Sequence, residues 1–575
     1  MKIALVPLNP IVGDIAGNAA MHVAAIARAR EAGADLVVFP ELSICGYPPK
    51  DLLIAEGFVE ACIAAAKELG EQHTSGITAI FGLPLPMDRT TYRAGAPIHN
   101  SLLAYRDGLM VDYYDKRLLP TYDVFDEDRH FEPGNRAVVI DVPVRGMKPV
   151  RVGLSICEDL WKGEDAGFAH RYHAAADPVV ELVKAGAQMI VSPSASPFVL
   201  RKMERHRQIL ADHAFKHKVP VISLNQLGGN DDLIFDGHKL IFGVSGDISA
   251  DGAMFREEIL VADVDPSTTG KCGPMSAEPC DEAQLFRALV LGVRDYLRKT
   301  GFTKALIGLS GGIDSALTAA IAVAAIGAKN VLGVAMPGTY SSDHSKADAY
   351  DLAKRLGMEC PTISIEPPLD GFREVIDAAF RDRGLLALGE KLPDLTEENI
   401  QSRIRGSILM TLSNRTGAIV LTTGNKSELA VGYCTLYGDM NGGLAVLSDV
   451  SKMMVYSLSR WINANHARCG FATPPIPQRT IDKAPSAELR PDQTDQDSLP
   501  PYPVLDEIIE RYVEKRQGAA TIIREANFDE TLVRRVVRMI DLAEYKRKQA
   551  ATGLKVTTVA FGFGRRVPIA QKWKG

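Results

Sequence analysis

"KALIGLSGGIDSALT", residues 304–318, places a short apolar run before a pair of glycines and an alanine-rich segment after them. The run predicts a buried strand, the glycines predict a tight turn, and the residues that follow predict a helix from Ser315. "NVLGVAMP" (330–337) then predicts a second strand. Strand, helix and strand in this order form a βαβ unit, so we expect a parallel sheet in this part of the chain.

The first half of the chain alternates short apolar runs with helix-forming segments, the first of them an alanine-rich helix from about Asn18, which predicts layered α/β structure. Two segments are similar: "AGADLVVFPELS" (32–43) and "AGAQMIVSPSAS" (185–196). Their alignment pairs Glu41 with Ser194, so we expect two polar side chains at equivalent strand tips, where α/β folds bind ligands. The strands expected in this half include "KIALVPL" (2–8), "DLVVFPE" (35–41), "ITAIFGLP" (77–84), "VRVGLSIC" (150–157) and "QMIVSPS" (188–194).

The length of the chain requires more than one domain, because single cores stop growing near about 250–300 residues and this chain has 575. Between Asp265 and Ala283 the sequence is rich in Pro, Gly, Ser and Thr and has no periodicity, as in a linker. We therefore expect domains at 1–265 and 282–575, joined by a linker at 266–281. The second domain is expected to open with a long helix.

A second polar stretch, residues 477–502, also contains several prolines. It is too long for a simple connection, which predicts a functional lid. Lys483, Glu488 and Asp497 are available to close over a ligand.

The composition, 46% hydrophobic and 24% charged, is ordinary for a globular protein. A net charge of −6 without a basic run argues against nucleic acid as a partner and favours small molecules. The longest apolar stretches, such as 316–328, are shorter than the roughly 20 residues that span a bilayer, and the start lacks a signal-peptide pattern. Eight scattered cysteines without zinc spacing predict a reduced, cytoplasmic enzyme.

Three residues of the first half are candidates for covalent chemistry. Cys157 in "LSICEDLW" (154–161) follows an apolar run, Glu41 ends one, and Lys116 lies in "YYDKRLLP" (113–120). A thiol nucleophile needs a base and a group that stabilises the developing oxyanion, and burial would tune Glu41 toward a base. Taken singly, each residue has an ordinary alternative, as a core thiol, a capping carboxylate or a surface lysine.

Together these segments resemble the nitrilase superfamily, whose members cleave nitriles or amides with a Glu–Lys–Cys triad on an αββα sandwich. "FPELSICGY" (39–47), "DKRLLP" (115–120) and "SICEDLW" (155–161) carry the resemblance, which covers about 1–265. It implies that Glu41 is the general base, Lys116 the electrostatic stabiliser and Cys157 the nucleophile. Glu127 resembles the family's supporting glutamate.

"SGGIDS" (310–315) follows a predicted strand and opens a helix, so its backbone N–H groups can cradle an anion. It is neither a Walker A loop nor GxGxxG. A glycine turn at such a junction is often only structural. Asp314, however, can hold Mg²⁺ beside phosphates, and Ser310 and Ser315 can donate hydrogen bonds.

This loop resembles the pyrophosphate loop of the N-type ATP pyrophosphatases, which have a Rossmann-like parallel sheet. "TEENIQSRIRG" (396–406), "TTGNKSELAVGY" (422–433) and "YKRKQ" (545–549) are similar to the NAD⁺ synthetase family, as is part of 477–502. The resemblance implies that Asn399, Glu428 and Lys546 contact deamido-NAD⁺ and that Asp314 and Glu428 hold Mg²⁺. The ATP site it implies is Gly308, Leu309, Ser310, Gly311, Gly312, Ile313, Asp314, Ser315, Thr423 and Lys452.

The chain departs from the family's short members at one position. They carry a lysine in "TKYGD", where "TLYGDMNGG" (435–443) has Leu436. A lysine contact to substrate at this position is therefore excluded, and the use of Asp439 stays open.

The two halves together are similar to the glutamine-dependent NAD⁺ synthetase family, in which an amidase supplies ammonia to a ligase. The resemblance implies L-glutamine, ATP and deamido-NAD⁺ as small-molecule partners, and we expect a homo-oligomer. Because free ammonia is mostly protonated at neutral pH, we also expect a sheltered path for it between the two sites. The short apolar stretches predict no membrane partner. Tyr122, Glu158, Ser196 and Lys202 would bind glutamine. GMP synthetase, which shares the SGGxDS loop, is one alternative. A glutamine-sensing scaffold with an inactive ligase half is another, although Asp314 and Glu428 argue against it.

Overall fold

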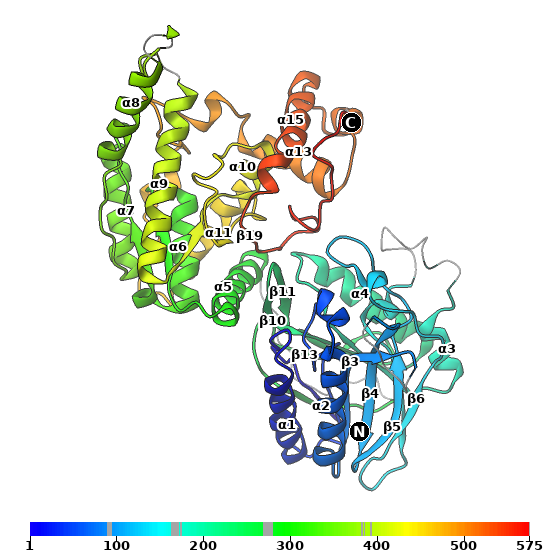
Figure 1. Cartoon of the computed structure of the whole chain (residues 1–575). Coiled ribbons are helices and arrows are strands. Elements are labelled where there is room, and N and C mark those ends of the chain that lie inside the picture. Colours follow the sequence, from blue (N-terminus) through cyan, green and yellow to red (C-terminus); the bar gives the residue numbers. More distant parts are fainter. Residues whose placement is uncertain are drawn as a thin grey trace. The chain divides into compact units, whose positions relative to one another are not determined.

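The computed structural model describes residues 1–88, 95–162, 172, 175–267, 280–380, 383–384, 386–391 and 394–573. The chain divides into two compact units, Met1–Cys280 and Asp281–Gly575 (Figure 1). Each unit has its own hydrophobic cores. Most of the predicted linker, 266–281, lies outside the described residues. Within the described ranges, no helix has both the length and the apolar character needed to cross a membrane.

The first unit contains two six-stranded sheets, each with parallel strands at its centre and antiparallel strands at its edges. In order, the first sheet is β14 (Leu260–Asp263), β1 (Lys2–Leu5), β2 (Leu36–Val38), β3 (Thr78–Pro86), β4 (Ile98–Arg106) and β5 (Leu109–Asp115). The second is β13 (Ile248–Gly252), β12 (Lys239–Phe242), β9 (Val221–Asn225), β8 (Met189–Ser194), β7 (Val150–Leu154) and β6 (Val139–Val142). The two-stranded β10 (Leu227–Asn230) and β11 (Leu233–Asp236) complete the unit.

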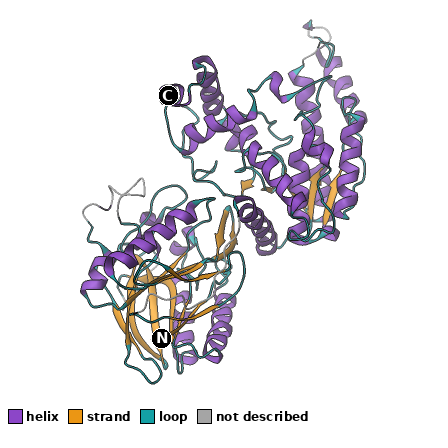
Figure 2. Cartoon of the chain, turned by 180° about the vertical axis from the view of Figure 1, so that it is seen from behind, coloured by secondary structure: helices purple, strands orange, loops and turns teal. Residues whose placement is uncertain are grey.

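The two sheets face each other across a fully buried core to which both contribute, for example Leu5 and Val38 from one and Val191 and Ile222 from the other. Helices α1 (Ile15–Glu31) and α2 (Phe58–His73) cover the outside of the first sheet. Helices α3 (Pro178–Lys184) and α4 (Lys202–His217) cover the second (Figure 2). This four-layer arrangement confirms the predicted αββα sandwich.

The second unit has one parallel sheet, which confirms the predicted sheet type. Its strands run in the order β16 (Val331–Val334), β15 (Ala305–Gly308), β17 (Ile419–Thr422), β18 (Leu444–Ala445) and β19 (Thr552–Gly553). From β15 the chain passes through α6 (Ile313–Ile326) to β16 on one side, and later through α9 (Leu395–Thr416) to β17 on the other. The strand order therefore reverses beside β15, and ligands of such sheets bind at that point.

Helices surround this sheet and form a second core beyond it. The expected long helix is α5 (Asp281–Thr300), which packs on α6 and α11 (Lys452–Ala464). Helix α7 (Asp343–Leu356) packs on α6, and α8 (Glu366–Phe380) packs on α9 (Figure 1). The second core joins α10 (Lys426–Val431), α13 (Tyr502–Ile509), α14 (Ala519–Ala526) and α15 (Glu530–Leu542), and α16 (Glu544–Arg547) follows.

Two helices begin earlier than the sequence predicted, and in both cases the preceding residue explains the start. Helix α6 begins at Ile313 rather than Ser315, because the extended Gly312 is its N-cap. Helix α1 begins at Ile15 rather than about Asn18, because the side chain of Asp14 accepts a hydrogen bond from Gly17 N and caps it.

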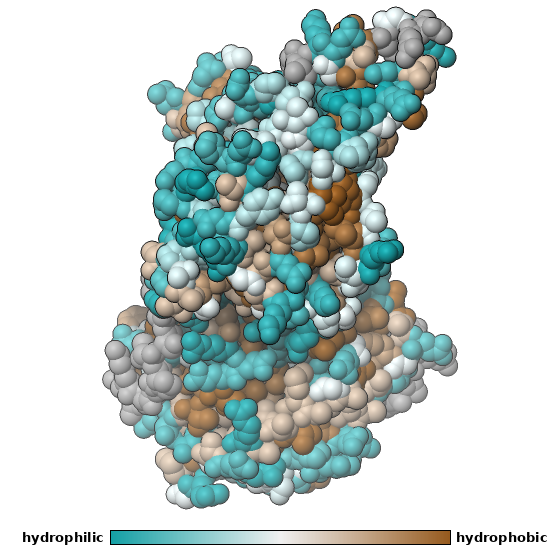
Figure 3. Space-filling view, turned by 90° about the vertical axis from the view of Figure 1, so that its left-hand side faces the viewer, coloured by the Kyte–Doolittle hydropathy of each residue, from teal (hydrophilic) through white to brown (hydrophobic). Residues whose placement is uncertain are grey.

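One side of the second unit carries exposed apolar side chains. On α8, Phe372, Val375 and Ile376 are 43%, 66% and 38% exposed, at the spacing of one helical face. Figure 3 shows the side on which α7 and α8 lie, with apolar areas among mostly hydrophilic ones. A face of this kind is typical of a contact surface.

Candidate active sites

The nucleophile predicted at Cys157 lies on a strained turn just beyond β7. It is 5% exposed and opens the short 3-10 turn Cys157–Leu160 with a φ of +43°. A non-glycine residue in this region costs roughly 1–3 kcal/mol and persists only where neighbouring contacts enforce it. Such strain is concentrated at functional sites, so the turn is a candidate for chemistry.

Asp159 supplies contacts that hold this turn, and the sequence did not reveal that role. Its fully buried carboxylate accepts hydrogen bonds from Ile156 N (3.0 Å), the Tyr114 hydroxyl (2.8 Å), Arg117 N (3.0 Å) and Leu118 N (2.9 Å). The last two donors follow Lys116 directly. One carboxylate therefore ties the turn of the nucleophile to the loop of the lysine; its place two residues after the cysteine was the only signal.

Lys116 joins two carboxylates in the buried centre of the first unit. Its Nζ donates to Glu41 Oε1 at 2.7 Å and to Glu127 Oε1 at 2.9 Å. All three side chains are at most 5% exposed. The structure thus brings together the predicted base, the predicted stabiliser and the predicted supporting glutamate.

Glu41 is fixed by two further donors that the sequence did not reveal. Asn100 Nδ2 donates to its Oε1 at 2.6 Å, and Ala195 N donates to its Oε2 at 2.8 Å. Ala195 follows Ser194, so the strand tips that the internal repeat aligned do converge. A Cβ on Gly82 would lie 2.3 Å from Leu42 N, so only glycine lets β3 pack this closely under the Glu41 loop.

Burial dominates the acid–base properties of this site. It raises the pKa of the Cys157 thiol well above its usual range, and the charge of Glu41 adds to the shift while that of Lys116 opposes it. It also raises the pKa of Glu127 to about 7, against the charge of Lys116. For Lys116, burial acts to lower the pKa, but Glu127 and Glu41 outweigh it and the pKa is raised. The resting thiol is therefore protonated and needs a base.

The residues predicted to bind glutamine form two groups. Beside the thiol, the Tyr122 and Tyr172 hydroxyls donate to Glu158 at 3.0 and 3.1 Å, and burial raises the pKa of Glu158. Lys202 Nζ donates to Ser196 Oγ at 2.8 Å and lies 5.6 Å from the centroid of the Trp161 ring. The positive charge of Lys202 also acts on Glu158, which links the two groups. Tyr172 was not predicted.

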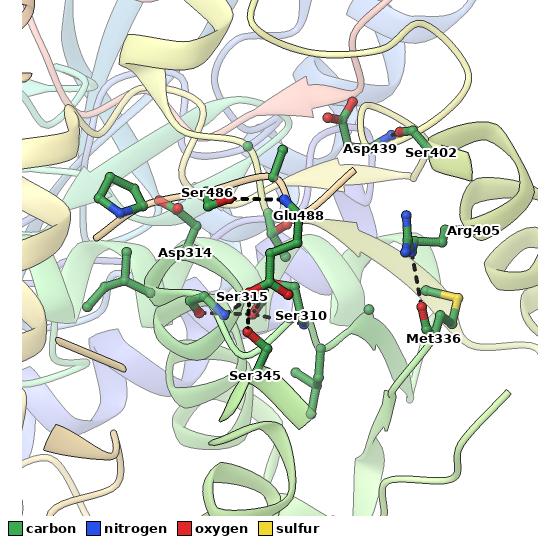
Figure 4. A pocket seen from close by; sticks show the side chains of 18 of the residues that line it. Ser310, Asp314, Ser315, Met336, Ser345, Ser402, Arg405, Asp439, Ser486 and Glu488 are labelled. Atoms are coloured by element: carbon green, nitrogen blue, oxygen red, sulfur yellow. Dashed lines mark hydrogen bonds between the residues drawn. The ribbon is translucent and has the colours of Figure 1, made fainter. Parts of the chain in front are cut away.

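The second unit contains a cavity of about 280 Å³ at the carboxyl ends of β15, β16 and β17, where the strand order reverses (Figure 4). Among the predicted ATP, substrate and metal residues, its lining includes Gly308, Leu309, Ser310, Gly312, Ile313, Asp314, Ser315, Thr423, Glu428 and Lys452. Gly311 packs behind the loop with a φ of +78°, and a Cβ there would meet Ser345 O at 2.2 Å. The predicted glycine loop is therefore the floor of this cavity.

Lys452 lies between the two carboxylates that the sequence assigned to a metal. Its Nζ is 2.6 Å from Asp314 Oδ2 and 3.0 Å from Glu428 Oε1, while Asn425 Nδ2 donates to Asp314 Oδ1 at 2.9 Å. Burial raises the pKa of Glu428 to about 7 against the charge of Lys452. Among the described residues, no group of three or more Cys, His, Asp or Glu side chains could hold a metal.

Two predicted substrate residues do not line the cavity. Asn399 accepts a hydrogen bond from Thr435 Oγ1 at 3.0 Å, and Lys546 Nζ donates to Gly432 O (2.8 Å) and Cys434 O (2.6 Å). Both side chains thus contact the segment just after α10. Their roles toward deamido-NAD⁺ stay predictions.

Part of the predicted lid lies over the cavity. Lys483 and Glu488 line it, and Glu488 Oε1 accepts from Lys483 Nζ (2.6 Å) and from Ser345 Oγ (2.7 Å) (Figure 4). Asp497 does not line the cavity. Its carboxylate instead accepts hydrogen bonds from Thr494 N and Oγ1 within the segment itself. The predicted closing role is thus supported by position for two of the three residues.

Arg405 and Asp439 also face the cavity, and neither was assigned a role from the sequence (Figure 4). Arg405 Nε donates to Met336 O at 3.1 Å, and burial lowers the pKa of Arg405 to about 10. Burial raises the pKa of Asp439 to about 6. Ser402 lies one helical turn before Arg405 on α9. This spacing is the only indication of Ser402 that the sequence offered.

Comparison with known proteins agrees with this two-site architecture. A carbon–nitrogen hydrolase family model matches residues 2–273, and an NAD synthase family model matches residues 285–550. A glutamine-dependent NAD(+) synthetase from Synechocystis sp. is 44% identical over 99% of this chain and 98% of its own length. The chain belongs to the glutamine-dependent NAD⁺ synthetase family. This membership decides against the GMP synthetase alternative.

Other family members extend over the same length. The glutamine-dependent NAD(+) synthetase of Rhodobacter capsulatus is 41% identical over 100% of this chain and 99% of its own. The solved structure of the Acinetobacter baumannii enzyme in complex with adenosine diphosphate is 36% identical, with a TM-score of 0.73 over 99% of this chain and 98% of that one. The family's hydrolase and synthase parts therefore correspond to the first and second units.

Proposed function

We propose that the first unit hydrolyses the side-chain amide of glutamine at Cys157 and that the second unit uses the ammonia, with ATP, to convert deamido-NAD⁺ to NAD⁺. The observation that carries the proposal is the buried pair of Glu41 and Lys116, whose charges act on the Cys157 thiol on its strained turn. The cavity above the glycine loop supports the second half.

In the first step, Glu41 takes the thiol proton of Cys157 while the sulfur attacks the amide carbon of glutamine. The amide oxygen becomes an oxyanion. An ammonium group has three N–H donors, and Glu41 and Glu127 accept from two of those on Lys116. The third can donate to the oxyanion, so Lys116 stabilises the tetrahedral intermediate.

In the next steps, protonated Glu41 gives its proton to the leaving nitrogen, the C–N bond breaks, and ammonia leaves a glutamyl thioester on Cys157. Water then attacks the thioester carbon and Glu41 accepts a proton from it. The C–S bond breaks, the sulfur recovers a proton, and glutamate leaves. The α-amino and α-carboxylate groups of glutamine are held by Tyr122, Glu158, Ser196 and Lys202. This set offers a negative group, Glu158, and a positive group, Lys202, close to the thiol.

In the second unit, the carboxylate of deamido-NAD⁺ attacks the α-phosphorus of ATP and pyrophosphate leaves. Ammonia then attacks the activated carboxyl carbon and AMP leaves. The backbone N–H groups of residues 310–313 and the start of the 14-residue α6 favour the phosphates. Lys452 and Thr423 line other walls of the cavity and would face the phosphates. Asn399 and Lys546 lie outside that lining, against the segment after α10, and would contact deamido-NAD⁺ there.

The side chains at Asp314 and Glu428 fit a magnesium ion. Mg²⁺ usually takes one or two carboxylates together with substrate phosphates, and these two acids share one bound cation, the ammonium of Lys452. Asp314 and Glu428 would hold the ion, which supplies charge neutralisation to the phosphates. Lys452 would then turn from the carboxylates to the phosphates.

Three further features complete the proposal. Ammonia is mostly protonated in neutral water, so it travels to the second site by a sheltered path.

The exposed apolar face of α8 supports a homo-oligomer, which light scattering would test. The seven cysteines among the described residues have free thiols, which supports a cytoplasmic location.

The test is a complete product balance for the purified protein. With deamido-NAD⁺, ATP, Mg²⁺ and glutamine, we expect equal amounts of NAD⁺, AMP and pyrophosphate, and at least as much glutamate. Ammonium salts should replace glutamine at raised pH. A scaffold with an inactive ligase half would release glutamate but make no NAD⁺ from either donor.

A further inference from the structure

The loop that carries Glu41 is held in a strained conformation. Leu42, the next residue, has a φ of +48°, which a leucine adopts only where its surroundings enforce it. Glu41 and Leu42 are both at most 1% exposed. The position of the carboxylate therefore depends on what holds residues 42–45.

Two polar side chains of α1 hold this loop from behind. Asn18 Nδ2 donates to Ile44 O at 3.0 Å and to Ile11 O at 2.9 Å. His22, one helical turn later, lies with Nε2 2.9 Å from Ser43 Oγ. Both side chains are at most 1% exposed in a hydrophobic core, where polar groups are retained only if they are hydrogen-bonded.

The hydrogen bonds of His22 determine its tautomer. Nδ1 lies 2.7 Å from Asn18 O, and a carbonyl oxygen only accepts, so Nδ1 carries the proton. Nε2 is then the acceptor and the Ser43 hydroxyl donates to it. Burial lowers the pKa of His22 to about 4, so this neutral form is the one present near neutral pH.

We propose that His22 and Asn18 are positioning residues for glutamine hydrolysis: they fix the strained loop at Ser43 and Ile44 and so aim Glu41 at Cys157. The inference rests on the proposed role of Glu41 as the base. Neither residue contacts the thiol or glutamine. They therefore act only through the loop. Positioning of this kind matters because an error of about 1 Å in the placement of a reacting group can cost about 100-fold in rate.

The variants His22→Leu and His22→Gln separate this role from packing. Leucine fills the space but cannot accept from Ser43, whereas the glutamine amide can. We expect His22→Leu to lower kcat for glutamine hydrolysis by about tenfold or more with little change in KM, and His22→Gln to recover most of it. Synthesis from ammonium should stay at the wild-type rate in both.

A second readout is the pH dependence of the alkylation of Cys157 by iodoacetamide, with Cys157→Ala as the background. His22→Leu should shift this profile in the same direction as Glu41→Gln does, because both remove a correctly placed base. The matched control is Ile26→Ala, one turn further along α1 and fully buried, which loses packing without a polar link to the loop. It should leave the profile unchanged.

Unchanged hydrolysis and an unchanged profile in His22→Leu would overturn the positioning role, as would an equal loss of both activities. If His22→Leu does not fold, Ser43→Ala makes the same test, because it removes the hydroxyl that His22 holds. If Glu41→Gln still hydrolyses glutamine, the proposed function of Glu41 fails instead. The two failures are therefore distinguishable.

Discussion

The ammonium nitrogen of Lys116 lies 2.7 Å from Oε1 of Glu41, and each side chain is only 1% exposed. Removing one partner of a buried ion pair leaves the other charge unpaired, which typically costs about 3–5 kcal/mol. We expect Lys116→Met to destabilise the first unit by an amount of this order and to abolish glutamine hydrolysis. Unfolding by urea and glutamate release measure the two effects.

A second change in the same pair separates charge from catalysis. Adding Glu41→Gln to Lys116→Met removes an unpaired carboxylate, so the double variant should regain part of the lost stability but none of the activity. If the double variant loses as much stability as the two single variants together, the pair is not coupled.

Glu127 should make the stability of the first unit depend on pH. Its pKa is raised from the ordinary 4.5 to about 7, so between these values the folded state holds a proton that the unfolded state has lost. Stability from this group is therefore full below about pH 4.5 and falls as the pH rises through about 7. Urea unfolding across this window should show a steeper fall for the wild type than for Glu127→Gln. Equal slopes would contradict the raised pKa.

We expect Asp314 to serve only the second reaction. Asp314→Ala removes a carboxylate that accepts from Lys452 and that would hold the metal, so synthesis of NAD⁺ should fall by about 100-fold or more with either nitrogen donor. Glutamine hydrolysis by the same protein should persist and shows that the first unit is intact. Normal NAD⁺ synthesis by this variant would refute the assigned role.

If residues 477–502 act as the predicted lid, we expect communication between the two reactions. We expect glutamine hydrolysis to accelerate when ATP and deamido-NAD⁺ are bound, with a coupling free energy of about 1–3 kcal/mol. Glu488→Gln should weaken this response, because Glu488 holds the lid to Ser345 at the cavity. Asp497→Asn is the control, since among the contacts described Asp497 bonds only within its own segment, to Thr494 and Arg490. Hydrolysis that ignores both ligands would refute the coupling.

The sequence predicted those parts of the sites that lie within short segments. The strand before Cys157 and the glycine loop before Asp314 depend on local patterning, and both formed, although the strand ends at Leu154 rather than at Cys157. The helix starts were predicted two or three residues late, because the capping by Gly312 and Asp14 depends on backbone conformation rather than on hydrophobic periodicity.

The residues that the sequence missed act across long separations. Asn100 reaches Glu41 from 59 positions away, and His22 reaches Ser43 from 21. No local period connects such partners; the sheet order and the packing of α1 bring them together. Conversely, Asn399 and Lys546 were assigned by resemblance, and their side chains contact the backbone and side chains after α10 rather than the cavity.

The most direct test of the account is the activity of Cys157→Ala with two nitrogen donors. NAD⁺ synthesis should be lost with glutamine and retained near the wild-type rate with ammonium salts at raised pH, because in the proposed mechanism the thiol serves only to release ammonia. An equal loss with both donors would mean that Cys157 supports the fold rather than the chemistry. Retained synthesis with glutamine would mean that the nucleophile lies elsewhere.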